Sequence, residues 1–293
     1  MVKKLKKIDL FDVINVIFLT VVALLMLYPM INIVAVSLTP YHLVLKEPWM
    51  IFPRQTTFEG YEYVFGNRNF WRSYLNSIFI TLSSMIIGLA VTSLMAWPLA
   101  RRELKGKGFV MGIVIFTMVF SAGMIPGYLN MKELGLLNTY WAVILPNAIS
   151  SFNTIVMINF FRQLPFELVE AAKIDGASEP TIFRRVVLPL SKPVLASIAL
   201  FLAVGVWNSY FYAQIYIRDR ELWPMALMLK EILLQASTAV LEAGADPGAL
   251  GKAIQPKTIQ YACIVVSTVP IMCIYPFFQK YFAKGVMLGS VKG

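Results

Sequence analysis

The sequence has little charge for its length. Only 14% of its 293 residues are Asp, Glu, Lys or Arg, whereas 58% are hydrophobic. A soluble domain of ordinary composition has about one quarter charged residues. A chain with this balance has too few charged groups to cover a water-exposed surface, so the composition predicts an integral membrane protein.

Metal-ligating and disulfide-forming residues are scarce as well. The chain has one histidine, His42, and two cysteines, Cys263 and Cys273, both within one apolar run. These residues do not form the Cys/His clusters of a metal site, and they give no disulfide framework. We therefore expect no metal and no cofactor on this chain.

Nucleotide-binding and hydrolytic motifs are also missing. The sequence contains no G-x-x-x-x-G-K-[ST] loop to hold phosphates, and "GKGFVMG" lacks the required spacing. It also contains no G-x-S-x-G turn for a nucleophilic serine. We assign no catalytic residue, and any energy source must come from another protein.

Six apolar runs are present, each long enough to cross a membrane, which takes about 20 residues of helix. None of them contains Asp, Glu, Lys, Arg or His. Ion-coupled carriers usually keep ionisable groups at membrane depth, so a secondary carrier is disfavoured. We expect one all-α membrane domain over residues 1–293. Its spans lie at about 13–38, 73–100, 108–130, 139–161, 194–217 and 259–279.

The distribution of basic residues predicts the orientation of these spans. The first run, preceded by "KKLKK", is too long for the apolar core of a cleaved signal peptide, which has about 7–15 residues. With it retained and the N-terminus inside, 16 of the 26 basic residues fall in inside segments. We therefore expect both termini and loop 162–193 in the cytoplasm, and loop 218–258 outside. This topology explains the net charge of +10 without nucleic-acid binding.

Loop 162–193, here called the charged loop, mixes acids and bases between two uncharged runs. Pro165 suits the first position of a helix, which we expect over 166–174. Gly176 suits the left-handed conformation that ends it. We expect a second short helix from about Pro180 to near Val187, since a proline follows at position 189.

The spacing of residues in the charged loop resembles the "EAA" loop of ABC importer permeases. Glu170-Ala171-Ala172 precedes Gly176, and nine residues separate Gly176 from Val186, where the family pattern often has Ile. In that family the loop docks in a groove of a cytoplasmic ATPase. The resemblance implies ATPase coupling by Glu170, Ala171, Ala172, Asp175, Gly176, Val186, Leu188 and Pro189.

The resemblance extends over most of the chain. "NSIFITL", "MAWPLARR", "GVWNSYF" and "GSVKG" are similar to the smaller, maltose-type permease subunit of carbohydrate importers. It implies the type I importer permease fold, in a bacterial cell membrane, and import of a carbohydrate, an oligosaccharide in particular. The implied partners are a homologous permease, two copies of an ABC ATPase that binds ATP and Mg, and an extracytoplasmic solute-binding protein. The family's tail follows the ATPase seam, so residues 286–293 are expected to contact it.

Polar residues on the apolar runs have two interpretations. Ser77, Thr81, Ser84, Gly88 and Thr92 share one helical face, which favours close helix packing. Amide, hydroxyl and aromatic groups elsewhere suit a sugar path, because sugars present both CH faces and hydroxyls. The candidates are Asn147, Ser151, Thr154, Asn208, Tyr210 and Tyr212.

Alternatives remain open at this point. An importer permease for a non-sugar solute shares every feature except the resemblance to carbohydrate importers. A secondary carrier and a membrane scaffold without transport activity are less favoured: the first lacks ionisable groups in its spans, and the second has no need of a bent charged loop.

Overall fold

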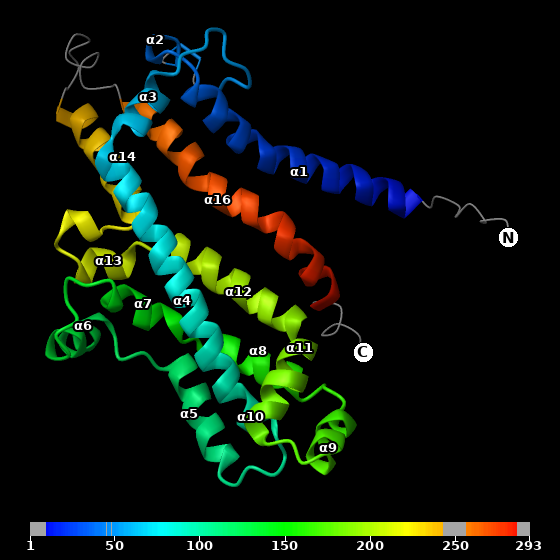
Figure 1. The fold of residues 1–293 in the computed structure, drawn as a ribbon. Helices are drawn as coiled ribbons and strands as arrows, with labels where there is room; N and C mark the ends of the chain where they lie inside the picture. Colours follow the sequence, from blue (N-terminus) through cyan, green and yellow to red (C-terminus); the bar gives the residue numbers. More distant parts are fainter. Residues whose placement is uncertain (1–9, 45, 48, 243–255, 286–293) are drawn as a thin grey trace. The chain divides into compact units, whose positions relative to one another are not determined.

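The computed structural model describes residues 10–44, 46–47, 49–242 and 256–285, and these residues form helices and connections without a strand (Figure 1). They divide into two compact units. The first comprises Met1–Arg68 and Glu231–Thr268, and the second comprises Asn69–Lys230 and Val269–Gly293.

The first unit contains α1 (Leu10–Ser37), α2 (Tyr41–Val44), α3 (Glu59–Gly66) and the first part of α16 (Pro256–Gly285). Most apolar side chains of α1 are exposed, as expected for a helix that meets lipid or another subunit. Its last turn is buried in a small core that includes Ala35, Val36, Val44 and Met50.

Helix α3 lies close to α16 within this unit. A Cβ placed on Gly60 would lie 2.9 Å from the Thr258 carbonyl oxygen, so only glycine allows this approach. The Thr258 hydroxyl also donates a hydrogen bond to the Thr39 carbonyl oxygen, at 3.3 Å. These contacts join the start of the last apolar helix to the segment after α1.

The second unit is built around α4 (Arg68–Ala100), a single apolar helix of 33 residues. Two clusters of buried apolar side chains form the core of this unit. Its other elements are α5 (Lys107–Val119), α6 (Met124–Glu133), α7 (Trp141–Ala148), α8 (Ser151–Phe161), α9 (Phe166–Ile174), α10 (Glu179–Ile182), the π-helical turn Phe183–Val187, α11 (Leu188–Leu190), α12 (Lys192–Trp207), α13 (Phe211–Tyr216), the 3₁₀ turn Arg220–Leu222 and the start of α14 (Met225–Glu242).

Among the described residues, three single helices are long and apolar enough to cross a membrane, and the count rises to six if three bent pairs each form one span. The single helices are Leu10–Ser37, Arg68–Ala100 and Lys257–Phe277. The bends are 115° between α5 and α6, 42° between α7 and α8, and 79° before α12.

The middle runs are therefore not the uninterrupted helices that their apolar composition suggests. Residues 108–130 break after α5, where Gly123 takes a φ of +86°. Residues 139–161 break at Ile149 and Ser150, which have extended backbones. In 194–217, α12 ends at Trp207, and the Asn208 side chain hydrogen-bonds the Val204 carbonyl oxygen. Hydropathy detects apolar length and is insensitive to such breaks.

The segment after the fifth run contains α14, Met225–Glu242. Hydrogen bonds attach its start to α4. The Asn76 Nδ2 donates to the carbonyl oxygens of Glu221 and Trp223, at 2.8 and 3.1 Å. The Ser77 hydroxyl accepts the Met225 N–H at 2.7 Å. Residues 243–255 lie outside the described part.

The small-residue face of α4 is buried, which confirms its predicted role in helix packing. Ser77, Thr81, Ser84 and Thr92 are at most 8% exposed. A Cβ on Gly88 would lie 2.5 Å from the Ala148 carbonyl oxygen and 2.9 Å from the Leu202 Cδ1. Gly88 therefore lets α4 approach both α7 and α12.

We predict that Gly88→Ala destabilises the protein, because the added methyl group overlaps a backbone oxygen that has little freedom to move. Overpacking of this kind costs about 1–3 kcal/mol. The measurement is the thermal midpoint of the purified protein in detergent, followed by fluorescence-detected size exclusion. Gly112→Ala in α5 is the control, because its Cβ meets nothing within 4 Å. An equal midpoint for both variants contradicts the close-approach interpretation.

Candidate functional site

The charged loop folds as two short helical segments joined at Gly176. Helix α9 covers Phe166–Ile174, the range predicted from the sequence. Gly176 has a φ of +79°, the left-handed conformation predicted for it. A Cβ on this glycine meets nothing within 4 Å, so the backbone angle alone favours glycine here.

The second segment extends further than the sequence suggested. It was expected to end near Val187, but the helical backbone continues from Glu179 to Leu190 through the π-helical turn Phe183–Val187. A proline ring within an α-helix clashes with the carbonyl of the preceding turn. The wider π-turn Phe183–Val187 includes Arg185, four residues before Pro189, whose carbonyl such a ring would meet, and the sharp bend falls at Ser191.

The residues expected to contact an ATPase differ in exposure, and two of them, Ala172 and Val186, pack against the core of the second unit. Glu170, Ala171, Asp175 and Pro189 are exposed, whereas Ala172, Val186 and Leu188 are partly buried. Ile174, which sequence reasoning missed, is 86% exposed at the end of α9. An exposed aliphatic side chain beside two small alanines is suited to burial against a partner protein.

The buried side of the loop packs against the membrane helices. Val169, Ile182 and Val187 are at most 3% exposed and belong to one core cluster with residues of α4, α8 and α12. The loop is therefore fixed to the spans by apolar contact along both of its helical segments.

A cluster of charged side chains joins the loop to the end of α4. The Arg101 Nη1 lies 2.7 Å from the Glu179 Oε1, and the Lys173 Nζ lies 3.7 Å from the same oxygen. Glu103 lies 4.0 Å from both cations. Arg101 follows α4 directly, Lys173 belongs to α9 and Glu179 begins α10, so this cluster contacts both halves of the loop.

Arg101 is the most enclosed member of the cluster. Its side chain is 13% exposed, and its guanidinium carbon lies 4.6 Å from the centre of the Trp97 ring. An arginine stacked on an indole and paired with a carboxylate is held in a defined geometry. Sequence reasoning did not assign Trp97, Arg101 or Glu103, although "MAWPLARR" was noted; the signal was a basic pair placed directly after an apolar run.

A second site is a groove of about 590 Å³ between α7, α8 and α12. It lies at the break between α7 and α8 and near the end of α12. Irregular backbone at membrane depth occurs where it lines a cavity or is buried in protein. The groove is lined by Asn147, Ser150, Phe152, Asn153, Phe201, Leu202, Gly205, Val206 and Ser209.

Of the six residues predicted to form a sugar path, one, Asn147, lines this groove. Ser151 hydrogen-bonds Thr117 at 2.9 Å, which joins α8 to α5. Thr154 is fully buried, and its hydroxyl donates to the Ser150 carbonyl oxygen. Ser151 and Thr154 belong to α8, which contributes to the groove, but their hydroxyl groups bond to α5 and to the Ser150 backbone.

The other three predicted path residues lie beyond the groove. Asn208 is exposed and donates to Val204 within its own helix, at 2.9 Å. The Tyr210 ring lies 4.4 Å from the Lys230 Nζ. Tyr212 stacks on Tyr216 with an interplanar angle of 7°. The neighbouring residues Ser150, Asn153 and Ser209 contribute to the groove instead, because helix breaks displaced the faces that regular periodicity predicts.

The fold and the bent loop define a permease subunit of an ABC importer, and comparison with known proteins bears this out. Residues 63–288 match the family described as "Binding-protein-dependent transport system inner membrane component". The chain belongs to this family, and it is a transport subunit of the inner membrane. The predicted family, fold class and membrane location are confirmed.

Named relatives and a solved structure agree with this assignment. The chain is 46% identical to Protein LplC of Bacillus subtilis, over 97% of this chain and 95% of that protein. It is 42% identical to the polygalacturonan/rhamnogalacturonan transport system permease protein YtcP of the same organism, over 97% and 99%. A chain of a bacterial ABC transporter for the acidic polysaccharide alginate matches with a TM-score of 0.82 and 32% identity, over 96% of this chain and 100% of that one.

We predict that Glu179→Gln loosens the second segment of the charged loop. The Glu179 side chain is 51% exposed, so solvent screening limits the expected cost to about 1 kcal/mol. This corresponds to about fivefold faster amide hydrogen exchange in residues 177–185 of the purified full chain. Glu103→Gln is the matched control, since its carboxylate lies 4.0 Å from the same cations. Exchange that rises equally in both variants, or in neither, contradicts the anchoring role of Glu179.

Proposed function

We propose that this chain forms half of the translocation path of an ATP-driven importer for a carbohydrate, specifically an oligosaccharide. A homologous permease forms the other half, two copies of an ABC ATPase bind ATP and Mg, and an extracytoplasmic binding protein delivers the sugar. The observation that carries the proposal is the bent charged loop, attached to α4 by Arg101 and Glu179.

Coupling follows from this attachment. The exposed side of α9, with Glu170, Ala171 and Asp175, docks on the ATPase in the cytoplasm. Closure of the ATPases pulls the loop, and Arg101 transmits the pull to α4. Because α4 contacts α7 and α12 at Gly88, its movement reaches the elements that line the groove.

The groove supplies the chemistry that a sugar needs. Asn147, Asn153 and Ser209 offer amide and hydroxyl groups to sugar hydroxyls, and Phe152 and Phe201 offer ring faces to CH groups. Two similar transporters are named for polygalacturonan/rhamnogalacturonan and for alginate, which supports an oligosaccharide over an amino acid or a metal ion. Residues 286–293, expected to contact the ATPase, lie outside the described residues.

The coupling role of the loop is tested at Gly176. We predict that Gly176→Val abolishes most sugar uptake and substrate-stimulated ATP hydrolysis in the reconstituted complex, while the subunit still inserts and assembles. A β-branched residue resists the left-handed conformation by about 1–2 kcal/mol. Gly176→Asn is the matched variant, because asparagine tolerates this conformation and the site has room for it.

The probes for this experiment are labelled oligogalacturonides, alginate oligosaccharides and neutral arabino-oligosaccharides, with the sugar that the cognate binding protein retains used for uptake. Wild-type uptake and ATP hydrolysis in Gly176→Val contradict the coupling role of the bend at Gly176. If the binding protein retains none of the three probes and the assembled complex still hydrolyses ATP, a non-sugar solute becomes the favoured substrate.

The groove is tested with two asparagines that make the same local hydrogen bond. The Asn147 Nδ2 donates to Val143 at 2.8 Å, and the Asn208 Nδ2 donates to Val204 at 2.9 Å. Of these two asparagines, Asn147 lines the groove and Asn208 does not. We predict that Asn147→Leu raises the KM for uptake about tenfold, as an unpaired sugar hydroxyl costs about 1–3 kcal/mol. Asn208→Leu changes it less than twofold, and equal effects would remove the groove from the path.

A further inference from the structure

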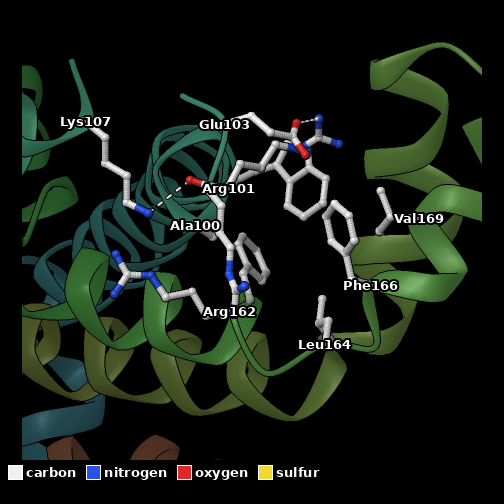
Figure 2. Close-up of a pocket in the computed structure, with 11 residues that line it drawn as sticks. Ala100, Arg101, Glu103, Lys107, Arg162, Leu164, Phe166 and Val169 are labelled. Atoms are coloured by element: carbon white, nitrogen blue, oxygen red, sulfur yellow. Dashed lines mark hydrogen bonds and ion pairs between the residues drawn. The ribbon is translucent and has the colours of Figure 1, made fainter. Parts of the chain in front are cut away.

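A cavity of about 460 Å³ lies where three apolar helices reach the charged loop (Figure 2). It is formed at the end of α4, the start of α5 and the end of α8, and the first part of the loop covers it. This volume falls within the range of small-molecule sites, about 300–1,000 Å³. The coupling role described above does not use this space.

Basic side chains dominate the polar part of the lining. Arg101, Arg102, Lys107 and Arg162 line the cavity, against the single acid Glu103. Within the described part of the chain, Arg102, Lys107 and Arg162 form no ion pair with a carboxylate; the Lys107 Nζ donates to the Arg101 carbonyl oxygen at 2.9 Å. The cavity therefore has an unbalanced positive charge that attracts an anion.

Arg101 adds buried donors to this charge. Its Nη1 is paired with Glu179, but its Nε and Nη2 are buried and have no hydrogen-bond partner in the chain. Buried polar groups without partners are uncommon, and a bound ligand is one explanation for them. A guanidinium presents N–H groups in a fork that matches two oxygens of a phosphate.

The rest of the lining is apolar. Figure 2 shows Leu164, Phe166 and Val169 on one side of the cavity, with Lys107 and Arg162 on the other. A free inorganic anion makes no use of an apolar wall. A molecule with a phosphate at one end and hydrocarbon at the other uses both sides.

We propose that this cavity is a binding site for a phosphate ester, supplied by the headgroup of an anionic phospholipid of the inner leaflet. Basic pockets between membrane helices on the cytoplasmic side are suited to such headgroups. The cavity lies at the ends of helices α4 and α8, and the ends of helices that are long enough to span a bilayer are expected near the headgroups. The bound phosphate lies behind the charged loop and accepts hydrogen bonds from Arg102 and Arg162.

The sidedness of this site rests on the proposed function, which places the charged loop in the cytoplasm. The phosphate chemistry rests on the cavity alone. The two are therefore tested separately: selective lipid retention by a complex that fails to transport sugar supports the site and leaves only the transport proposal in question.

The experiment titrates the purified full chain, in its complex, with phosphatidylglycerol in a neutral detergent, and counts retained lipids by native mass spectrometry. Phosphatidylcholine is the zwitterionic comparison. We expect the Arg102→Gln/Arg162→Gln double variant to weaken retention of the first phosphatidylglycerol at least tenfold. The Arg102→Lys/Arg162→Lys variant keeps the charge and retains most of the affinity, which separates loss of the site from misfolding.

Lys105→Gln is the matched control. Lys105 is exposed on the same connection between α4 and α5, but it does not line the cavity. We expect its effect on retention to be less than twofold. If Lys105→Gln reduces phosphatidylglycerol retention as much as the double variant does, lipid binding reflects general attraction between basic residues and anionic lipid, and the proposed site is overturned. Equal retention of phosphatidylglycerol and phosphatidylcholine by the wild type also overturns it.

Glycerol 3-phosphate and inorganic phosphate identify the source of the phosphate. We expect neither, at millimolar concentration, to displace the lipid, because neither contacts the apolar wall. Displacement by glycerol 3-phosphate that depends on Arg102 and Arg162 keeps the phosphate site but overturns the lipid source. If binding of the ATPase in the absence of lipid protects the cavity arginines from chemical modification, the cavity is a protein contact and the proposal is overturned.

Discussion

The contact between Arg101 and Glu179 is the interaction on which the coupling proposed for the charged loop depends. A guanidinium stacked on Trp97 and 13% exposed has lost much of its hydration, and the Glu179 carboxylate offsets this loss with a charged hydrogen bond. Glu179 opens the second segment of the charged loop. The loop is therefore attached by a charged contact at its bend and by apolar contacts on either side, which lets it move with α4 as one body.

The proposed movement has a defined destination. At Gly88 the backbone of α4 approaches the Ala148 carbonyl oxygen, where α7 ends, and the Leu202 side chain, which lines the groove. Close contacts with backbone atoms are stiff, because no side-chain rotamer absorbs a displacement. The broken pair α7–α8, joined by the extended residues Ile149 and Ser150, supplies the compliance instead. Short helices joined by extended residues change their angle without breaking hydrogen bonds inside a helix.

The sequence predicts the parts of this protein that depend on composition and on local backbone chemistry. Apolar length identified segments that fold as three long helices and three bent pairs, and Gly176 was identified because a left-handed residue favours glycine. The helix breaks were missed, because Ile149 and Ser150 are no more polar than their neighbours. The groove residues were then assigned by assuming regular helices, so the expected path included Thr154, which is buried against its own helix. Arg101 was missed because its partner is 78 residues away in the chain.

The absence of charge from the spans limits what the groove can discriminate. Its lining consists of amide, hydroxyl, aromatic and aliphatic groups, and among the described residues no acid or base contributes to it. Such a lining rewards hydroxyl groups and CH faces, but it offers no counter-ion, so an anionic sugar gains nothing there over a neutral one and must give up some hydration. In a complex that imports an acidic oligosaccharide, selection by charge therefore falls to the binding protein or to the partner permease. In the proposed mechanism, this half of the path needs only to hold the sugar weakly enough to release it when the charged loop moves.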